Sequence, residues 1–384
     1  MIIWPIFWFF GLVAIIALAA AVTASAIVLF LTVRRRKRTP TRLNGIAAIV
    51  MTMVLAFVSV YSGTTGLNIW HWMSELSEPN IIEDDGELAM RETDEIWYNY
   101  RPFGNDTRTI SADFESDLII TRNYPRLDGA TAFLPVYSAV AETIYSELNS
   151  DDVPKYIQLS TTSQAFERLT QRETDIIFTL QPSQAQIEDA KQYGVEFIKT
   201  PIFSEAFVFF VNEANPIDSL TTEQIRQIYT GEITNWKDVG GQDEEIVAYQ
   251  RNANSGSQTT MEQVVMRGFT MAKPETELYH GFMGSILRGV AQYDNHERAL
   301  GYSFRFYSTV INPHYGLKLL SVDGIEPTPE NIANNSYPFT VNVYAITTEQ
   351  GLKNPNTQAV IDWLVSPQGQ QLIEQTGYVG LETS

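Results

Sequence analysis

The sequence predicts an α/β domain built around a mostly parallel sheet and preceded by two transmembrane helices. Three observations support this fold class. The first 70 residues are largely apolar, every acidic residue lies after Trp70, and short β-branched or aromatic runs alternate with helical patterns from Asp117 onward. Such alternation is typical of βαβ units. The 384 residues suffice for two or three domain-sized units.

The N-terminal region has the length and charge pattern of a helical hairpin in a bilayer. Residues 2–33 and 46–66 are two apolar runs, and a bilayer core is crossed by about 20 such residues in a helix. All six basic residues of this region lie between the runs, at 34–42, and basic loops remain in the cytoplasm. A signal peptide fits poorly, because its positive charges precede the apolar run. We therefore expect residues 1–70 to cross the plasma membrane twice, with the C-terminal domain outside the cytoplasm. One span followed by a buried helix is the alternative.

The remainder of the chain is strongly acidic. Six of the 26 Lys and Arg residues precede Trp70, which leaves 20 against 45 acidic residues and a formal charge of −25. Such a surface repels nucleic acid, so we expect no nucleic-acid partner. The chain has no Cys, and its four His residues show no metal-binding spacing, so we expect neither a metal nor a cofactor. No nucleophile–base pair stands at a recognisable spacing, so we expect no enzyme.

Several segments after residue 70 have a predicted role in the fold. Residues 71–116 are acidic and irregular, which indicates a juxtamembrane linker with some local structure. The expected strands are 118–120, 156–159, 175–180, 206–212 and 337–347, and the expected helices are 134–148, 163–172, 222–229 and 356–374, the last interrupted at Ser366-Pro367.

Three segments share one design, in which small hydroxyl residues stand between a strand and a helix. These are residues 128–133, 160–163 and 251–257. A helix N-terminus offers unpaired N–H donors and partial positive charge, Ser and Thr add hydroxyl donors, and Arg251 adds a planar charged fork. Together they would hold a small oxyanion without a metal. Taken singly, each segment is better explained by ordinary helix capping, which is the commonest role of Ser and Thr at these positions.

The order and spacing of these segments resemble the PstS-type phosphate-binding protein family, the solute receptors of phosphate ABC transporters. Residues 128–137, DGATAFLPVY, are similar to the family's first loop and helix. Residues 251–257, RNANSGS, are similar to its Arg-x-x-x-Ser-Gly-Thr loop. Residues 219–236, which end in GEITNW, and 363–379, which begin with WLVSPQG, add to the resemblance. It covers about residues 125–381.

The resemblance implies a periplasmic-binding-protein-like fold of type II. Its two lobes would comprise residues 117–204 with 335–384, and residues 205–334, with the ligand in the cleft between them. It implies a membrane-anchored binding protein that captures an oxyanion, first of all phosphate, and passes it to ABC permease subunits or reports its presence. The implied anion contacts are Thr131, the backbone of Ala132, Thr162 or Ser163, Arg251, Ser255, Gly256 and Ser257.

Two positions depart from the family pattern. Leu180 stands where the family has an Asp that accepts the proton of bound phosphate, and Ala253 stands where it has an acidic partner of the Arg. A carboxylate only accepts hydrogen bonds, so it favours a ligand that carries a proton. Without it, phosphate and sulfate are harder to distinguish, unless Asp128 or Glu205 acts as a substitute. These departures keep open an alternative function, a sensor or adaptor whose pocket no longer binds phosphate.

Overall fold

The computed structural model describes residues 85–149, 151–273, 279–280, 283–292, 296–313 and 316–381. All of these lie in the second of two compact units of the chain, Pro79–Ser384. The transmembrane hairpin expected at residues 1–70 lies outside the described residues. Within the described ranges, no helix is both long and apolar enough to cross a bilayer.

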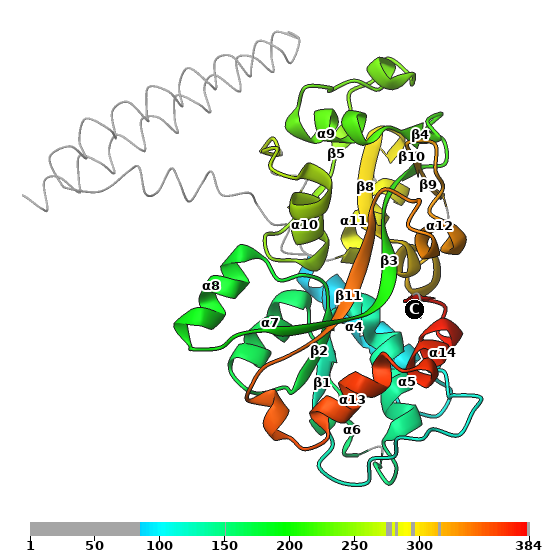
Figure 1. Ribbon diagram of the computed structural model, residues 1–384. Coiled ribbons are helices and arrows are strands. Elements are labelled where there is room, and N and C mark those ends of the chain that lie inside the picture. Colours follow the sequence, from blue (N-terminus) through cyan, green and yellow to red (C-terminus); the bar gives the residue numbers. More distant parts are fainter. Residues whose placement is uncertain are drawn as a thin grey trace, which may run out of the picture. The chain divides into compact units, whose positions relative to one another are not determined.

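One long strand joins the two halves of the main sheet. Strand β3 pairs with β11 along its first part, up to Ala206, and with β8 from Phe207 onward. The sheet has the order β1-β2-β11-β3-β8-β5, with β12 and β9 also paired to β3. β3 and β11 therefore connect a first lobe, around β1 and β2, with a second lobe, around β8 and β5 (Figure 1).

The prediction of a mostly parallel sheet is wrong. β1 with β2 and β5 with β8 are parallel, as βαβ units require. The pairs of β3 with β11, β8, β9 and β12, and of β11 with β2, are antiparallel. The chain leaves the first lobe along β3 and returns along β11, so these two neighbours run in opposite directions.

The elements alternate along the chain as follows. The strands are β1 (Leu127–Gly129), β2 (Ile176–Thr179), β3 (Ile198–Asn212), β4 (Ser219–Leu220), β5 (Val247–Ala248), β6 (Gln250–Arg251), β7 (Tyr279–His280), β8 (Ala299–Phe304), β9 (Leu317–Leu319), β10 (Ser321–Val322), β11 (Thr340–Thr347) and β12 (Val379–Gly380). The α-helices are α4 (Asp85–Tyr100), α5 (Leu134–Ile144), α6 (Val153–Tyr156), α7 (Thr162–Thr170), α8 (Gln184–Gln192), α9 (Thr222–Thr230), α10 (Gly256–Thr260), α11 (Met283–Gln292), α12 (Pro329–Ala333), α13 (Thr357–Leu364) and α14 (Pro367–Gln375). Short 3-10 or π turns are η1 (Thr131–Phe133), η2 (Trp236–Val239), η3 (Met261–Met266), η5 (His296–Arg298), η6 (Tyr307–Ile311) and η7 (Gly351–Lys353).

Helix starts follow their capping signals closely. Thr161, Ser183 and Thr221 each accept a hydrogen bond from the backbone N–H three residues on, while a Gln side chain bonds back to the cap. Ser366 caps α14 and separates it from α13, as the Ser-Pro interruption predicts.

Two expected strands do not form. At 118–120 only Ile120 makes a bridge, to Tyr145, and in 156–159 only Ile157 does, to Leu127. Ile120 and Ile157 are buried, whereas Ile119 is 52% exposed, so these short stretches contribute single buried side chains and no ladder.

The expected linker contains a well-packed helix. α4 spans Asp85–Tyr100, and its Ile96 and Tyr100 are 4% and 5% exposed within the main core. It packs against α5 of the first lobe and α11 of the second. This helix is concealed in the sequence, because only Ile96 and Tyr100 are buried among residues 91–100 and five of the 16 residues of α4 are acidic.

Candidate functional site

The first hydroxyl-rich segment follows β1. Gly129 lies so close to β2 that a Cβ would overlap the carbonyl oxygen of Phe178, so this position needs glycine. Next, Ala130 N–H donates to that carbonyl at 3.0 Å, and η1 begins at Thr131. Ala132 is buried and Thr131 is half-buried, directly before α5.

A buried carboxylate joins the first segment to the second. Asp128 accepts hydrogen bonds from the Gly129 N–H at 2.8 Å, from the Ser160 N–H at 3.0 Å and from the Ser160 hydroxyl at 2.9 Å. It also pairs with Arg168 of α7 at 2.9 Å. Burial raises the pKa of Asp128, while the bonds from Ser160 and Gly129 and the charge of Arg168 act against that rise. Asp128 therefore joins the first segment to the second, and its carboxylate is already engaged by Gly129, Ser160 and Arg168.

The second segment starts α7 with its side chains turned toward the other lobe. Thr161 caps the helix, so Thr162 and Ser163 occupy its first turn, where backbone N–H groups are unpaired. The Ser163 hydroxyl donates to the carbonyl oxygen of Asn254 at 3.0 Å. This bond joins α7 directly to the third segment.

The third segment runs from β6 into α10. Arg251 is 6% exposed, and its N–H donates to Gln258 Oε1 and to the Tyr302 hydroxyl oxygen, both at 3.0 Å. Ser255 caps α10 through the Gln258 N–H at 3.2 Å. Gly256 and Ser257 follow in the first turn, both buried. Ser255, Gly256 and Ser257 thus form one helix start, and the backbone of Arg251, on β6, is bonded to Gln258 of the same helix.

The structure brings the second and third segments into contact. A Cβ on Gly256 would lie 2.9 Å from Thr162 Oγ1 and 3.5 Å from Leu180 Cδ1, so only glycine leaves room between the lobes here. The hydroxyl of Ser183, the cap of α8, donates to Asn254 Oδ1 at 2.7 Å. The cleft is closed at this edge.

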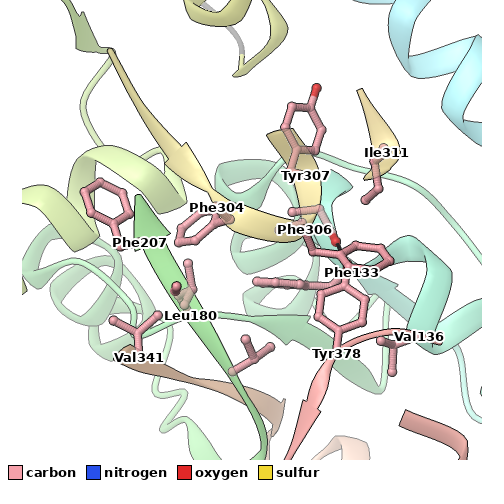
Figure 2. Packing of buried hydrophobic residues seen from close by; sticks show 14 of the residues in the cluster. Phe133, Val136, Leu180, Phe207, Phe304, Phe306, Tyr307, Ile311, Val341 and Tyr378 are labelled. Atoms are coloured by element: carbon pink, nitrogen blue, oxygen red, sulfur yellow. Dashed lines mark hydrogen bonds between the residues drawn. The ribbon is translucent and has the colours of Figure 1, made fainter. Parts of the chain in front are cut away.

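Leu180 occupies an apolar position. It is 3% exposed and belongs to the core cluster with Phe207, Phe304 and Val341, as Figure 2 shows. The rings of Phe207 and Phe304 lie 5.5 Å apart. Residue 180 therefore provides no hydrogen-bond acceptor for a proton of the ligand.

Glu205 is not a free substitute either. It is 3% exposed on β3, and it accepts hydrogen bonds from the N–H groups of Ala206 at 2.8 Å and Phe306 at 3.3 Å. Burial raises its pKa from 4.5 to about 7, against these bonds and the charge of Arg305. It lies at the crossing of the lobes, where β3 changes partner.

The comparisons with known proteins decide the family. A model of the PBP superfamily domain matches residues 121–368. The chain belongs to the PBP superfamily. Among curated relatives, the phosphate-binding protein PstS of Borreliella burgdorferi is 27% identical over 48% of this chain and 67% of its own length. Protein SphX of Synechococcus elongatus is 23% identical over 66% of this chain and 76% of its own.

Solved structures agree with the fold of this PBP-superfamily chain. A protein of Clostridium perfringens, assigned as a phosphate ABC transporter substrate-binding protein and solved with bound phosphate, superposes with a TM-score of 0.53. It is 25% identical and covers 67% of this chain and 100% of its own. A phosphate transport receptor of Vibrio cholerae gives 0.50 at 23% identity, which supports the fold alone. The Borreliella burgdorferi and Clostridium perfringens proteins are named as binding proteins, which supports the expectation that the chain is not an enzyme.

Sequence reasoning missed two parts of the region around the cleft. Asn254 adopts a left-handed conformation, φ +64°, and bonds to α7 and α8 of the opposite lobe. The Ser-x-x-Gln capping signal at residues 183–186 predicts the start of α8, but no local pattern indicates that α8 contacts Asn254. The second part is Glu92 of α4, which lies outside the stretch matched to the PBP superfamily.

Proposed function

We propose that this PBP-superfamily protein is a membrane-anchored, extracytoplasmic solute-binding protein that captures a small oxyanion, first of all phosphate. Capture would serve ABC-type uptake, with permease subunits as partners, or sensing. The observation that carries the proposal is the approach of two helix starts across the cleft, at Thr162 and Gly256. Helix-start N–H groups and hydroxyl groups lie there, and the third segment also carries the buried Arg251, whose guanidinium is suited to an oxyanion.

The names of the relatives support phosphate as the first ligand to test. PstS of Borreliella burgdorferi is named for binding phosphate, and the Clostridium perfringens structure contains it. We propose the contact residues Thr131, Ala132, Thr162, Ser163, Arg251, Ser255, Gly256 and Ser257. Their lobes would be residues 117–204 with 335–384, and residues 205–334.

The site is tested by calorimetry of the full-length chain against phosphate, sulfate and molybdate. Arg251→Ala should remove a buried charged partner of the anion and weaken binding by about 2–5 kcal/mol. Arg122→Ala, at an exposed position of the first lobe, is the matched control and should leave affinity unchanged. An Arg251→Ala variant that folds and binds as tightly as the parent would place the anion elsewhere.

Leu180 makes the choice of anion testable. A site built from donors alone selects tetrahedral anions but has no acceptor with which to require a ligand proton. Leu180→Asp should lower sulfate affinity more than phosphate affinity, because an acceptor facing an unprotonated oxygen in a dry site costs about 1–3 kcal/mol. Leu180→Asn is the control, because Asn has the same size as Asp but carries no charge. If the unmodified chain already prefers phosphate by about a thousandfold, roughly 4 kcal/mol, the reasoning from Leu180 is wrong.

A second function has its own support. Leu180 is packed in the apolar cluster, Ala253 replaces an acidic residue, and the Ser163 hydroxyl is already bonded to Asn254. These features suit a sensor or adaptor that keeps the fold without binding phosphate. Absence of heat for all three anions, with a folded protein, would favour it.

The membrane anchor is proposed from the sequence of residues 1–70. Protease added to intact cells should release the domain that follows residue 70, while a tag inserted at 34–42 should be protected. A C-terminal domain resistant to external protease would overturn the extracytoplasmic location.

A further inference from the structure

The carboxylate of Glu92 lies in surroundings that suit a bound anion. Its Oε2 pairs with Arg288 Nη1 of α11 at 3.2 Å, and its Oε1 accepts a hydrogen bond from the Tyr307 hydroxyl. The side chain is 11% exposed. Asn312 Nδ2 donates to the Tyr307 oxygen at 3.4 Å, which completes this polar cluster.

The same carboxylate lies against the N-terminal turn of α11. A Cβ on Gly284, the second residue of that helix, would overlap the Glu92 carboxyl group. Only glycine therefore lets the carboxylate approach so closely. The N-terminal end of a helix carries partial positive charge, which favours an anion at this point.

Arg251 of the proposed oxyanion site is connected to this cluster through β7. Arg251 in β6 pairs with His280 of β7, and β7 packs against α11, the helix that carries Arg288. The charge of Arg251 also lowers the pKa of both Glu92 and Tyr307, but less than burial raises it and less than their nearer partners affect it. A positive charge on one group and a negative charge on the other attract each other, and the attraction is strong where little water separates them. The negative charge of Glu92 thus reduces the positive potential that Arg251 offers to a ligand.

The helix that carries Glu92 lies outside the stretch that matches the PBP superfamily. The PBP-superfamily match begins at residue 121, and α4 ends at Tyr100. α4 is nevertheless docked, because it packs on α5 of the first lobe and α11 of the second, and Ile96 and Tyr100 lie in the core. The docking fixes the position of Glu92 beside α11.

We propose that Glu92 is an internal pseudo-ligand: α4 places its carboxylate on Arg288 and the start of α11, the helix that packs on the strand paired with Arg251, and thereby weakens oxyanion binding in the cleft. This inference rests on the proposed oxyanion-binding function. Arg288, Tyr307 and the start of α11 would be released for an external anion when the carboxylate is neutralised or displaced. Anion capture is then coupled to the docking of the segment that precedes the family domain.

The test compares phosphate and sulfate affinities of the full-length chain with those of Glu92→Gln. Glutamine has the same size and can still accept from Tyr307, but it carries no charge. We expect both anions to bind at least ten times more tightly, sulfate at least as much as phosphate, since the relieved repulsion grows with ligand charge. Glu95→Gln removes one charge from an exposed position of the same helix and should change affinity less than threefold.

A second variant reaches the same carboxylate from the opposite side. Gly284→Ala places a methyl group where the carboxylate lies and should displace it, with the same direction of change in affinity. This variant keeps the test decisive if Glu92→Gln fails to fold. If Glu92 has only a structural role, its substitution should lower the melting temperature without any gain in affinity.

The outcomes separate the two proposals. A folded Glu92→Gln variant with unchanged or weaker affinity, while the parent binds phosphate, overturns the pseudo-ligand and leaves the binding function standing. If the variant binds an anion and the parent does not, Glu92 blocks binding completely, which supports the inference in its strongest form. No binding by either protein removes the binding function, and the pseudo-ligand falls with it.

Discussion

Glu205 gives the chain a stability that depends on pH in a defined direction. Its carboxyl group is buried at the point where β3 passes between the lobes, and burial raises its pKa from 4.5 to about 7. In the unfolded chain the group is hydrated, and its pKa is close to the ordinary value. Between these two pKa values the folded protein holds a proton that the unfolded protein has lost, so the free energy of unfolding falls as pH rises.

The size of the effect follows from the two pKa values. Their difference of about 2.5, at 1.36 kcal/mol for each pH unit, corresponds to about 3 kcal/mol over the complete titration of both states. Glu205→Gln removes this titration. Relative to the parent, the variant should therefore gain about 2–3 kcal/mol of stability between pH 5 and pH 8, the part of the titration that falls in this range. Any constant cost of the amide, such as its NH2 group facing the Phe306 N–H, cancels in this difference.

The assay is urea denaturation of the full-length chain at pH 5 and pH 8, followed by near-UV circular dichroism. Glu213→Gln, at an exposed position just after β3, is the matched control and should follow the parent at both pH values. Parallel pH profiles for the parent and Glu205→Gln would refute the reasoning, because they would show that Glu205 is ionised at little cost in the folded state.

Two further substitutions test how the loops of the first lobe are held. Gly129→Ala should lower stability by about 1–3 kcal/mol and reduce the melting temperature, because the added Cβ would overlap the carbonyl oxygen of Phe178; an unchanged melting temperature would show that β1 can move away from β2. Arg168→Ala should cost about 1–3 kcal/mol in urea denaturation, because it removes the cationic partner of fully buried Asp128. Combining it with Asp128→Asn should cost less than the sum of the two single changes, and strict additivity would contradict the pairing.

Individual helices and strands are predictable where a single local sequence signal, such as a cap or an apolar run, determines them. α9 begins where Thr221 caps it and ends at Gly231, whose φ of +82° suits glycine. The second half of β3, residues 206–212, is predicted by its continuous apolar and aromatic run, which is typical of a strand buried on both faces. The first half, from Ile198, is not predicted, because polar residues interrupt its apolar ones. The start of α7, with the predicted Thr162 and Ser163, was located by the same kind of local pattern.

The direction of the central strands was not predictable in this way. Strand polarity depends on where the chain re-enters the sheet, and β11 pairs with β3 more than 130 residues later in the sequence. α4 was hidden because its burial depends on two helices, α5 and α11, that follow it at a distance. No pattern within residues 85–100 reports the identity of distant partners.

The sequence by itself determined the placement of charge, the helix caps and the three hydroxyl-rich segments, because each depends on residues within one turn or one strand of each other. Tertiary structure alone decided which of these groups meet. It placed Thr162 beside Gly256, enclosed Leu180 among aromatic rings and set Glu92 against Gly284. These contacts join residues from 27 to 192 positions apart. Only the packing of a whole chain selects among such distant pairs, since each gains its energy by excluding water together with its neighbours.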